Sequence, residues 1–495
     1  MFHDFLFSLS DCFLVFDYFG LIYIIFRYFG TSEIEKKTHY VDLFSYILVM
    51  FCCLIYLQFF IPSFSAYYYN HLFMSSQFII FIRVCIYSFA IICTLFVFVE
   101  NKNILCIPLS EFILLIPLLV LGISLSVASN DLFCIFLFIE LQSLVLYIFI
   151  ALAKNSNLAI EAAFKHFLIG TFASLVLIFG ISLLYYNFGT CSLDNLAILL
   201  TQSTISFSAK IGIIFICCGL LSKLGMAPFH YWVADVYQGT HSSIIAILAI
   251  LTKLPILVIF LKLYLLFITA CVDLKFFIII FSICSIYSGI FSSMYEVNLK
   301  RFLAFSAVSH MGFIVLGRVV ATPDAYFASV YYMLIYILNN IILFGILLIF
   351  VEPHVDRSSI FFLDKLQTLV IVRQSNFIIA VCLGMVFLSI AGVPPFAGFF
   401  AKFFILKALW DSGHILLCLL GLVASLLSSI YYLRCIRFLF FAPEDRTNYS
   451  NVDYSKHVIL VTIIIFFSFL GIISIFIQPS LIIYLHSLTL LFFRV

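Results

Sequence analysis

Long apolar runs recur along the whole chain, and short polar segments separate each run from the next. A helix of about 20 apolar residues crosses the roughly 30 Å hydrocarbon core of a bilayer. With 65% hydrophobic and only 10% charged residues, the 495-residue chain cannot be a soluble globular protein. The sequence therefore predicts an all-α membrane protein with no soluble domain and no long linker.

Reading the runs between polar breaks predicts about fourteen transmembrane helices. They lie near residues 11–29, 41–61, 76–99, 106–128, 132–153, 158–185, 209–236, 242–266, 274–295, 302–320, 325–350, 376–410, 414–441 and 456–477. Lys and Arg favour the loops of one side by roughly two to one. Because positively charged loops stay on the matrix or cytoplasmic side, we expect the loop between Arg357 and Arg373 to face inward and both termini outward.

The cysteines predict neither a disulfide framework nor a metal site. All fifteen are scattered through apolar runs, without the paired spacing that zinc or an iron–sulfur cluster requires. The net charge of +2 is too small to indicate whether the chain binds nucleic acid, and we expect no nucleic-acid partner.

Four lysines lie inside runs that otherwise predict lipid-embedded helices: Lys165, Lys223, Lys253 and Lys402. Each costs roughly 2.5–3.5 kcal/mol at the centre of a span, so together they oppose insertion by about 10–14 kcal/mol. Some could lie near span ends and extend their amines to the headgroups. The alternative is an internal row of protonatable sites, which predicts a membrane protein that handles protons or cations.

The segment LSKLGMAPFHYWVADVYQG, Leu221–Gly239, predicts a broken helix. Pro228 lacks a backbone N–H and clashes with the preceding turn, so a helix must break there. Broken helices at membrane depth line a cavity or are buried in protein. Lys223 precedes Pro228 by five residues, about 7.5 Å along a helix. We therefore expect exposed carbonyls and room for water beside this lysine, with His230 and Trp232 following the break.

A second break is predicted in AGVPPFAGFFAKFFILK, Ala391–Lys407, where Pro394 and Pro395 interrupt an apolar span and Lys402 follows. The two breaks fall in the seventh and twelfth predicted helices. Interrupted spans at corresponding places indicate repeats with a transport site at their interface, and an offset of five helices makes the second repeat inverted. The predicted division is a three-helix segment at 1–103, repeats at 104–266 and 267–441, and a terminal helix and tail at 442–495.

Other polar residues lie between the breaks. Glu140 is near the middle of the fifth helix, where we expect it to pair with Lys223. Lys165 lies on the sixth helix, and Lys253 is central on the eighth, beside Pro255 and without an evident carboxylate partner. His310 on the tenth helix is either a proton relay or a packed, hydrogen-bonded residue.

We expect Lys223, Lys253, His310 and Lys402 to line one polar axis along the membrane midplane. Burial disfavours the charged form of a lysine, and a nearby carboxylate favours it. The free energy of protonation of the lysine can change by about 4–7 kcal/mol between these two situations. Moving a proton against 100–200 mV costs about 2.3–4.6 kcal/mol. The magnitudes therefore permit a pump.

These segments resemble the subunit 2 family of respiratory complex I, the proton-pumping NADH:ubiquinone oxidoreductase, from about Leu132 to Phe404, and PFHYWVADVYQG is the most specific match. The resemblance implies that Glu140 is the helix-five glutamate and Lys223 its partner lysine. It implies that Lys253 is the central lysine, and Lys402 the terminal lysine of the second broken helix. Lys165 resembles a further lysine of bacterial relatives. The presence of a lysine, Lys402, at the terminal position argues against the related subunit 4. The presence of Lys253 at the central position argues against subunit 5.

The resemblance further implies an enzyme role only as a subunit, with proton translocation driven by quinone reduction elsewhere. NADH, FMN, iron–sulfur clusters and ubiquinone would bind other subunits, and this chain would bind no cofactor or metal. Its partners would be other membrane-arm subunits, especially neighbouring antiporter-like ones, and phospholipids such as cardiolipin. The implied location is the mitochondrial inner membrane.

Three alternatives differ in class. A stand-alone cation/proton antiporter of the same superfamily would share the lysines but need no partner subunits. A structural subunit would carry its charges as relics, against which stands the presence of all four lysines with Glu140. A di-haem cytochrome needs paired histidines on facing helices, and His166, His230, His241 and His310 show no such pairing.

Overall fold

The computed structural model describes residues 33–58, 66–104, 109–153, 156–202, 205–268, 273–350, 365–443, 465 and 479–493. The predicted spans near 11–29 and 456–477 lie outside this part of the chain, apart from Ile465.

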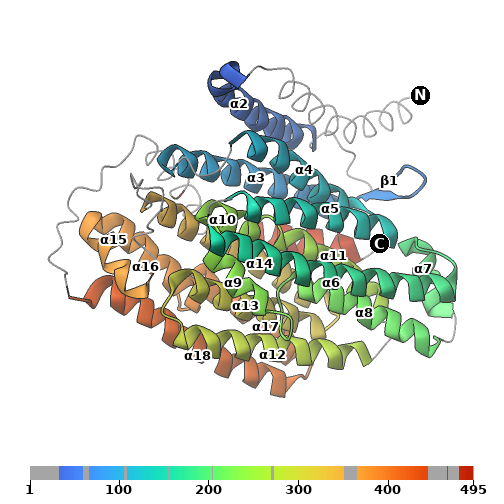
Figure 1. The fold of residues 1–495 in the computed structure, drawn as a ribbon. Helices are drawn as coiled ribbons and strands as arrows, with labels where there is room; N and C mark the ends of the chain where they lie inside the picture. The colour runs from blue at the N-terminus through green and yellow to red at the C-terminus, as the bar shows by residue number, and fades with distance from the viewer. Residues whose placement is uncertain are drawn as a thin grey trace.

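The described chain forms a bundle of long helices that run side by side (Figure 1). The helices are α2 (Glu33–Gln58), α3 (Gln77–Ile104), α4 (Leu109–Ala128), α5 (Leu132–Ala151), α6 (Asn157–Phe188), α7 (Leu193–Gln202), α8 (Phe207–Lys223), α9 (Tyr231–Gly239), α10 (Ser242–Ile250), α11 (Lys253–Ile268), α12 (Asp273–Tyr295), α13 (Leu299–Leu316), α14 (Pro323–Ile349), α15 (Val370–Ser375), α16 (Phe377–Ala391), α17 (Ala397–Asp411), α18 (Ile415–Phe441) and α20 (Pro479–Phe493), with 3₁₀ turns η1 (Gly317–Val319) and η2 (Leu366–Leu369). Nine helices of the described residues are long and apolar enough to cross a membrane.

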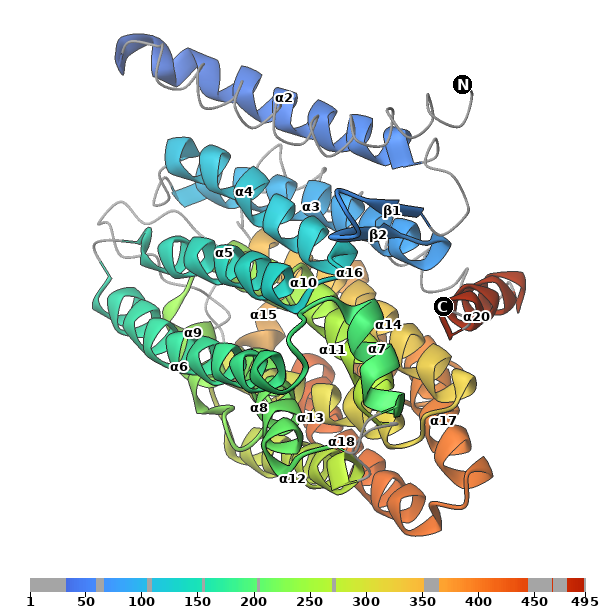
Figure 2. The same cartoon turned by 90° about the vertical axis from the view of Figure 1, so that its right-hand side faces the viewer.

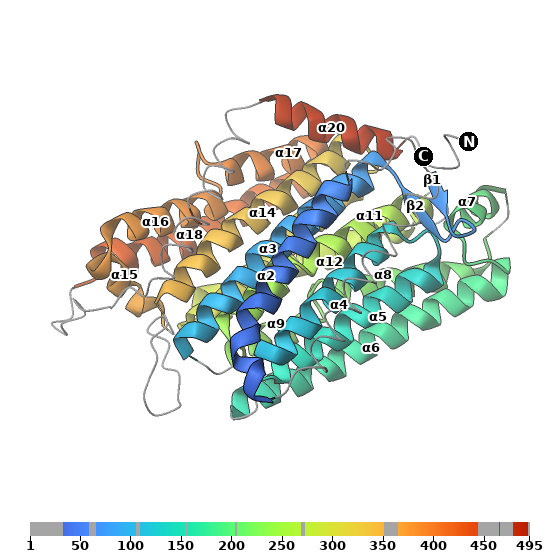
Figure 3. The same ribbon diagram turned by 90° about the horizontal axis from the view of Figure 1, so that it is seen from above.

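The centre of the bundle is formed by helices that are apolar on all sides. The span made of α10 and α11 and the span made of α13 and η1 are buried along their whole apolar length, and α14 nearly so. α6 lies at one edge, and α16 and α18 lie at the opposite edge (Figure 3). α2 packs on α3 and α4 at the amino-terminal side (Figure 2), and α20 packs on α14 and α3. Polar side chains on the central helices therefore face protein on every side.

Short polar side chains fix where the helices begin. The carboxylate of Asp131 accepts bonds from the N–H groups of Phe133 and Cys134 at the start of α5. The hydroxyl of Ser156 caps α6 in the same way. Because the first N–H groups of a helix lack partners within it, these caps set the ends of α5 and α6 and hence the depth of the residues that they carry.

The structure differs from the sequence prediction in three respects. The all-α membrane fold is confirmed, but β1 (Ala66–Tyr68) and β2 (Phe73–Ser75) add a small antiparallel hairpin in which Tyr67 opposes Met74. The short α7 and α15 and the terminal α20 were not expected. The predicted eighth helix is interrupted, since α10 ends at Ile250 and α11 begins at Lys253. Pro255 explains this break, because it has no N–H to donate to the carbonyl of Leu251.

Candidate functional site

The first predicted break lies between α8 and α9. α8 ends at Lys223, and Gly225 follows with a φ of +75°. Its N–H bonds the carbonyl of Ser222, and the N–H of Met226 bonds the carbonyl of Leu221. This pair of bonds is the Schellman ending of a helix, which requires a left-handed residue and so favours glycine. Pro228 then prevents the helix from resuming before Tyr231. The break is confirmed, and Lys223 is the last helical residue before it.

The second break repeats the same ending. α16 ends at Ala391, and Gly392 has a φ of +87°. The N–H groups of Gly392 and Val393 both bond the carbonyl of Leu388. Pro394 and Pro395 follow, and α17 begins at Ala397. Both predicted breaks are therefore built from a glycine-ended helix followed by proline.

Glu140 and Lys223 form the predicted ion pair across α5 and α8. Lys223 Nζ lies 3.4 Å from Glu140 Oε2 and 3.3 Å from the hydroxyl of Ser143. The hydroxyl of Ser143 in turn lies 3.1 Å from the same carboxylate oxygen. Lys223 is buried, whereas 24% of the Glu140 side chain is exposed on the outer face of α5. The carboxylate thus compensates a lysine charge that burial alone would disfavour.

Lys253 is the first residue of α11 and is buried at the break between α10 and α11. Its amine donates to the hydroxyl of Tyr336 on α14 at 3.4 Å and lies 5.4 Å from the centre of that ring. No ion pair among the described residues includes Lys253, as expected from the sequence. A phenol and a ring face stabilise an ammonium less than a carboxylate does, so this amine can release its proton more easily.

His310 on α13 is buried between tyrosines of two other helices. Its Nδ1 lies 2.8 Å from the hydroxyl of Tyr332, and its Nε2 lies 2.8 Å from that of Tyr432 on α18. The centre of its ring is 5.5 Å from that of Tyr336, the residue that contacts Lys253. His310 is therefore packed and hydrogen-bonded, and it also lies next to Tyr336, which contacts Lys253.

Lys402 on α17 turns back to the second break. Its amine donates to the carbonyl of Ala391 at 2.7 Å and to the hydroxyl of Ser428 at 3.0 Å. Ala391 is the last residue of α16, so Lys402 bonds a carbonyl that the helix ending leaves free. Lys223 is the last helical residue before its break, whereas Lys402 follows its own break and turns its amine back to it.

Contacts connect the expected axis from Lys253 to the second break. Lys253 touches Tyr336, whose ring neighbours His310, and His310 bonds Tyr432. Tyr432 lies one helical turn from Ser428, the partner of Lys402. At the other end, Lys223 lines one cavity with Thr252, the residue before Lys253. The structure thus places Lys253, His310 and Lys402 in one polar series, and Lys223 beside the residue that precedes Lys253.

Lys165 does not belong to this buried series, which corrects the sequence prediction. Its side chain is 39% exposed, and its amine lies 2.7 Å from carboxylate oxygens of both Glu161 and Asp235. Asp235 on α9 also pairs with Arg301 on α13, which pairs with Glu296. Lys165 lies only two turns from the start of α6, where it ties that helix to α9 in a surface ion-pair network.

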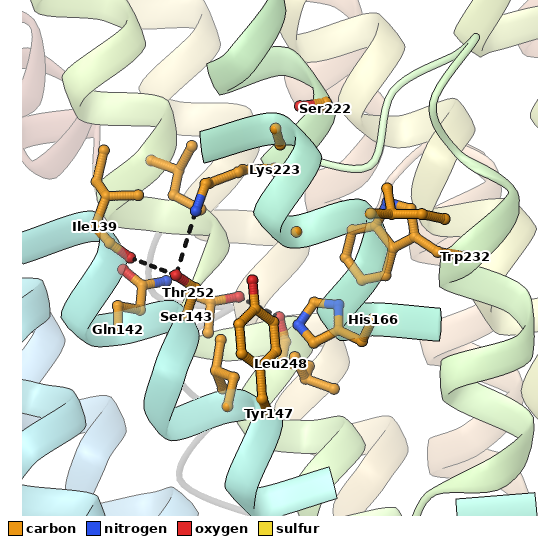
Figure 4. Close-up of a pocket in the computed structure, with 15 residues that line it drawn as sticks. Ile139, Gln142, Ser143, Tyr147, His166, Ser222, Lys223, Trp232, Leu248 and Thr252 are labelled. Carbon is orange, nitrogen blue, oxygen red and sulfur yellow. Dashed lines mark hydrogen bonds between the residues drawn. The ribbon is translucent and has the colours of Figure 1, made fainter. Parts of the chain in front are cut away.

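A cavity of about 40 Å³ lies beside the Glu140–Lys223 pair (Figure 4). Its polar lining comes from four elements: Gln142, Ser143 and Tyr147 of α5, His166 of α6, Ser222 and Lys223 of α8, and Trp232 of α9, with Thr252 between α10 and α11. Tyr147 lies between Lys223 and His166 in this view, and Ser143 lies beside the lysine amine. The room for water expected beside Lys223 is therefore present.

Sequence reasoning missed the tyrosines that surround His310. Tyr332, Tyr336 and Asn340 recur at intervals of four residues on α14, so they share one face of this mostly apolar helix. That polar stripe was the signal that could have identified them. Tyr432 had no such signal, because it meets His310 from a helix 122 residues away.

The groups of this site are amines, a carboxylate, an imidazole and hydroxyls. Within the described ranges, no three His, Cys, Asp or Glu side chains gather closely enough to hold a metal ion. Every polar member of the series can give or accept a proton. Proton transfer is therefore the chemistry that the arrangement offers by its own side chains.

Comparisons with known proteins agree on one family. Residues 129–428 match the family model described as NADH:quinone oxidoreductase/Mrp antiporter, TM. The chain is 32% identical over 353 residues to the NADH-quinone oxidoreductase subunit N of Ruthia magnifica subsp. Calyptogena magnifica, covering 69% of this chain and 71% of the relative.

Two solved assemblies contain chains of the same fold. A chain of respiratory complex I from Thermus thermophilus matches with a TM-score of 0.78 at 20% identity, over 95% of this chain and 98% of that one. A chain of the Mrp complex from Dietzia sp. DQ12-45-1b matches with a TM-score of 0.80 at 16% identity, over 97% of both chains. At these identities the likeness shows the fold alone.

Proposed function

The chain belongs to the NADH:quinone oxidoreductase/Mrp antiporter transmembrane family, and from this membership we propose how its site works. The protein is a proton-translocating membrane-arm subunit of an NADH-quinone oxidoreductase complex, respiratory complex I. The observation that best supports this function is the Glu140–Lys223 ion pair, in which Lys223 ends a broken, buried helix.

In the proposed mechanism the pair is a charge switch. Glu140 stabilises the ammonium of Lys223 at 3.4 Å. When the carboxylate moves away, the buried ammonium loses its compensation and its proton becomes easier to release. Lys253, which has only a phenol for a partner among the described residues, is the central station. His310 and its tyrosines link it to Lys402, which passes charge outward or to the neighbouring subunit.

The neighbour is proposed to cover the outer face of α5. Glu140 lies there within a stripe of exposed apolar side chains at Phe133, Leu137, Leu144 and Ile148. A carboxylate partly exposed to lipid at membrane depth is costly, whereas a protein partner can compensate it. The stripe and its carboxylate thus suit an antiporter-like subunit of the same complex better than lipid.

We further propose fourteen spans with both termini facing outward, arranged as two inverted five-helix repeats over 104–266 and 267–441. The protein is a multi-pass membrane protein, and we place it in the mitochondrial inner membrane with phospholipids such as cardiolipin at its surface. This chain would carry no redox centre, with NADH, FMN, iron–sulfur clusters and ubiquinone held by other subunits. Lys165 is proposed to hold α6 and α9 together rather than to carry protons.

The second candidate is a cation/proton antiporter that works alone. The observation in its favour is the fold shared with a chain of an Mrp complex. A third, a structural subunit that does not pump, would gain nothing from a lysine buried without a carboxylate, which is how Lys253 is placed.

Purification of the native chain in mild detergent separates the first two candidates. We expect the chain to run on a native gel in a large assembly that oxidises NADH. A chain that runs alone, and that exchanges cations for protons when reconstituted alone in vesicles, would contradict membership of complex I and support the antiporter.

A further inference from the structure

His166 lines the cavity beside Lys223, and the mechanism above gives it no role. It is 7% exposed on α6. The centre of its ring lies 4.6 Å from that of Trp232 and 5.1 Å from that of Tyr147. It lines the same cavity as Lys223 (Figure 4).

Five buried polar atoms of the cavity lining have no hydrogen-bond partner among the described residues. They are Gln142 Oε1, Trp232 Nε1, the hydroxyl of Tyr147 and both ring nitrogens of His166. A neutral imidazole presents one donor and one acceptor, the indole N–H only donates, the amide oxygen only accepts, and the phenol does both. Water can both donate and accept, so water molecules in the cavity can satisfy all five atoms.

The cavity has the size for such water. A cavity needs about 10–15 Å³ to hold one water, which occupies about 30 Å³ in the liquid, and a buried water needs two to four polar partners. The 40 Å³ cavity therefore holds about one to three waters, on a lining that His166 and Lys223 share. The polar groups and the volume therefore favour a short water chain between these two residues.

We propose that His166 is a proton-carrying residue, which exchanges a proton with Lys223 through water held in this cavity. The inference rests on the proposed function, because it adds a third titratable member to the Glu140–Lys223 pair. Tyr147 is the other titratable group of the described lining, and a neutral phenol is a far poorer base than an imidazole.

The transfer balances without any redox partner. When Glu140 separates from Lys223, the N–H bond of the ammonium breaks and its proton passes to the first water. Each water gives on one of its own protons, and the last one forms an N–H bond at the unprotonated ring nitrogen of His166. The positive charge has then moved from the amine to the ring. Return of the Glu140 carboxylate reverses the transfer by favouring the ammonium again.

The test is made in the assembled complex with two substitutions of one residue. His166→Gln keeps groups that bond water but cannot carry the proton, and His166→Phe loses both properties. His414, at the start of α18 and remote from the cavity, provides the control variants His414→Gln and His414→Phe. Assembly is followed on native gels, and proton uptake is measured together with NADH oxidation.

We expect both His166 variants to pump roughly tenfold more slowly per assembled complex, while the His414 variants pump normally. The effect is smaller than the 10² to 10⁴ typical of an essential acid–base group, because Glu140 and Lys223 remain. Normal pumping by His166→Gln would overturn the proposal, since the ring would then only hold water. If His166→Phe fails to assemble, His166→Gln alone decides.

A parallel Lys253→Met variant separates this inference from the function on which it rests. If Lys253→Met stops pumping and His166→Gln does not, the role of His166 is wrong and the proposed function stands. If Lys253→Met pumps normally, the proposed function itself is wrong.

Discussion

The three buried lysines differ in what stabilises their charge. Lys223 has a carboxylate, Lys402 has a backbone carbonyl and a hydroxyl, and Lys253 has a phenol. A carboxylate favours the ammonium most, and the two neutral environments favour it less. In the proposed mechanism, a proton is therefore held most firmly at Lys223 while Glu140 is near, and it moves along the series once Glu140 withdraws.

A double-mutant cycle tests the first pair. We expect Lys223→Met to lower the stability of the subunit by about 2–4 kcal/mol, somewhat less than breaking a fully buried pair, because Glu140 is partly exposed. Glu140→Gln should cost a similar amount. The double variant should cost less than the sum of the two, while all three lose pumping. Thermal inactivation of the assembled complexes measures this, and strictly additive losses would show that the two charges do not interact.

The sequence identified these residues unequally, for physical reasons. Glu140 and Lys223 were predictable as partners, since an isolated charge is costly in a span and few opposite charges were available. Lys165 was assigned to the buried series because an apolar run does not reveal which face of its helix is covered. The hydroxyl partners of Lys253 and Lys402 come from α14 and α18, and only tertiary packing brings them there.

At the scale of elements, the two glycine-ended breaks set where the lysines lie. A Cβ on Gly392 would meet Lys402 Cδ at 2.9 Å and Nζ at 3.3 Å. The glycine thus leaves the space through which Lys402 reaches the carbonyl of Ala391. The break and its lysine form one unit, because the residue that ends the helix also makes room for the amine.

Gly392→Ala should therefore slow proton pumping. Alanine at a φ of +87° costs about 1–2 kcal/mol in the backbone, and its methyl group displaces the Lys402 amine as well. Gly413→Ala is the matched control, because Gly413 has a φ of +80° with nothing within 4 Å of the added Cβ. Equal pumping by the two variants would show that the position of Lys402 does not matter.

The elements themselves were largely predictable. Proline and glycine within apolar runs indicated both breaks, since their backbone effects are local. The break between α10 and α11 was missed, although Pro255 lies in the first turn of α11. Proline is common in the first turn of a helix, but the apolar run around Pro255 was interpreted as one continuous span. The fourteen-span count stays a prediction.

At the scale of the whole molecule, polar groups lie at the centre and one edge carries an apolar stripe with a carboxylate. The loop charges predict which ends face inward. A membrane-impermeant amine reagent should label Lys365 from the matrix side alone. It should label Lys210, near the start of α8, from the opposite side alone. Both are accessible side chains. Mass spectrometry of labelled inside-out and right-side-out vesicles checks this, and labelling from the same side would refute the orientation.

Proton translocation through the buried series is the central claim, and Lys253 tests it most directly because it lies between the two predicted breaks. Lys253→Met keeps the length of the side chain and removes its proton, and Lys407→Met makes the same change on the exposed face of α17. The measurement is the rate of proton pumping per assembled complex together with the number of protons moved per NADH oxidised. We expect Lys253→Met to slow pumping by about 10², with Lys407→Met unchanged. Normal pumping by an assembled Lys253→Met complex, at the usual number of protons per NADH, would contradict it.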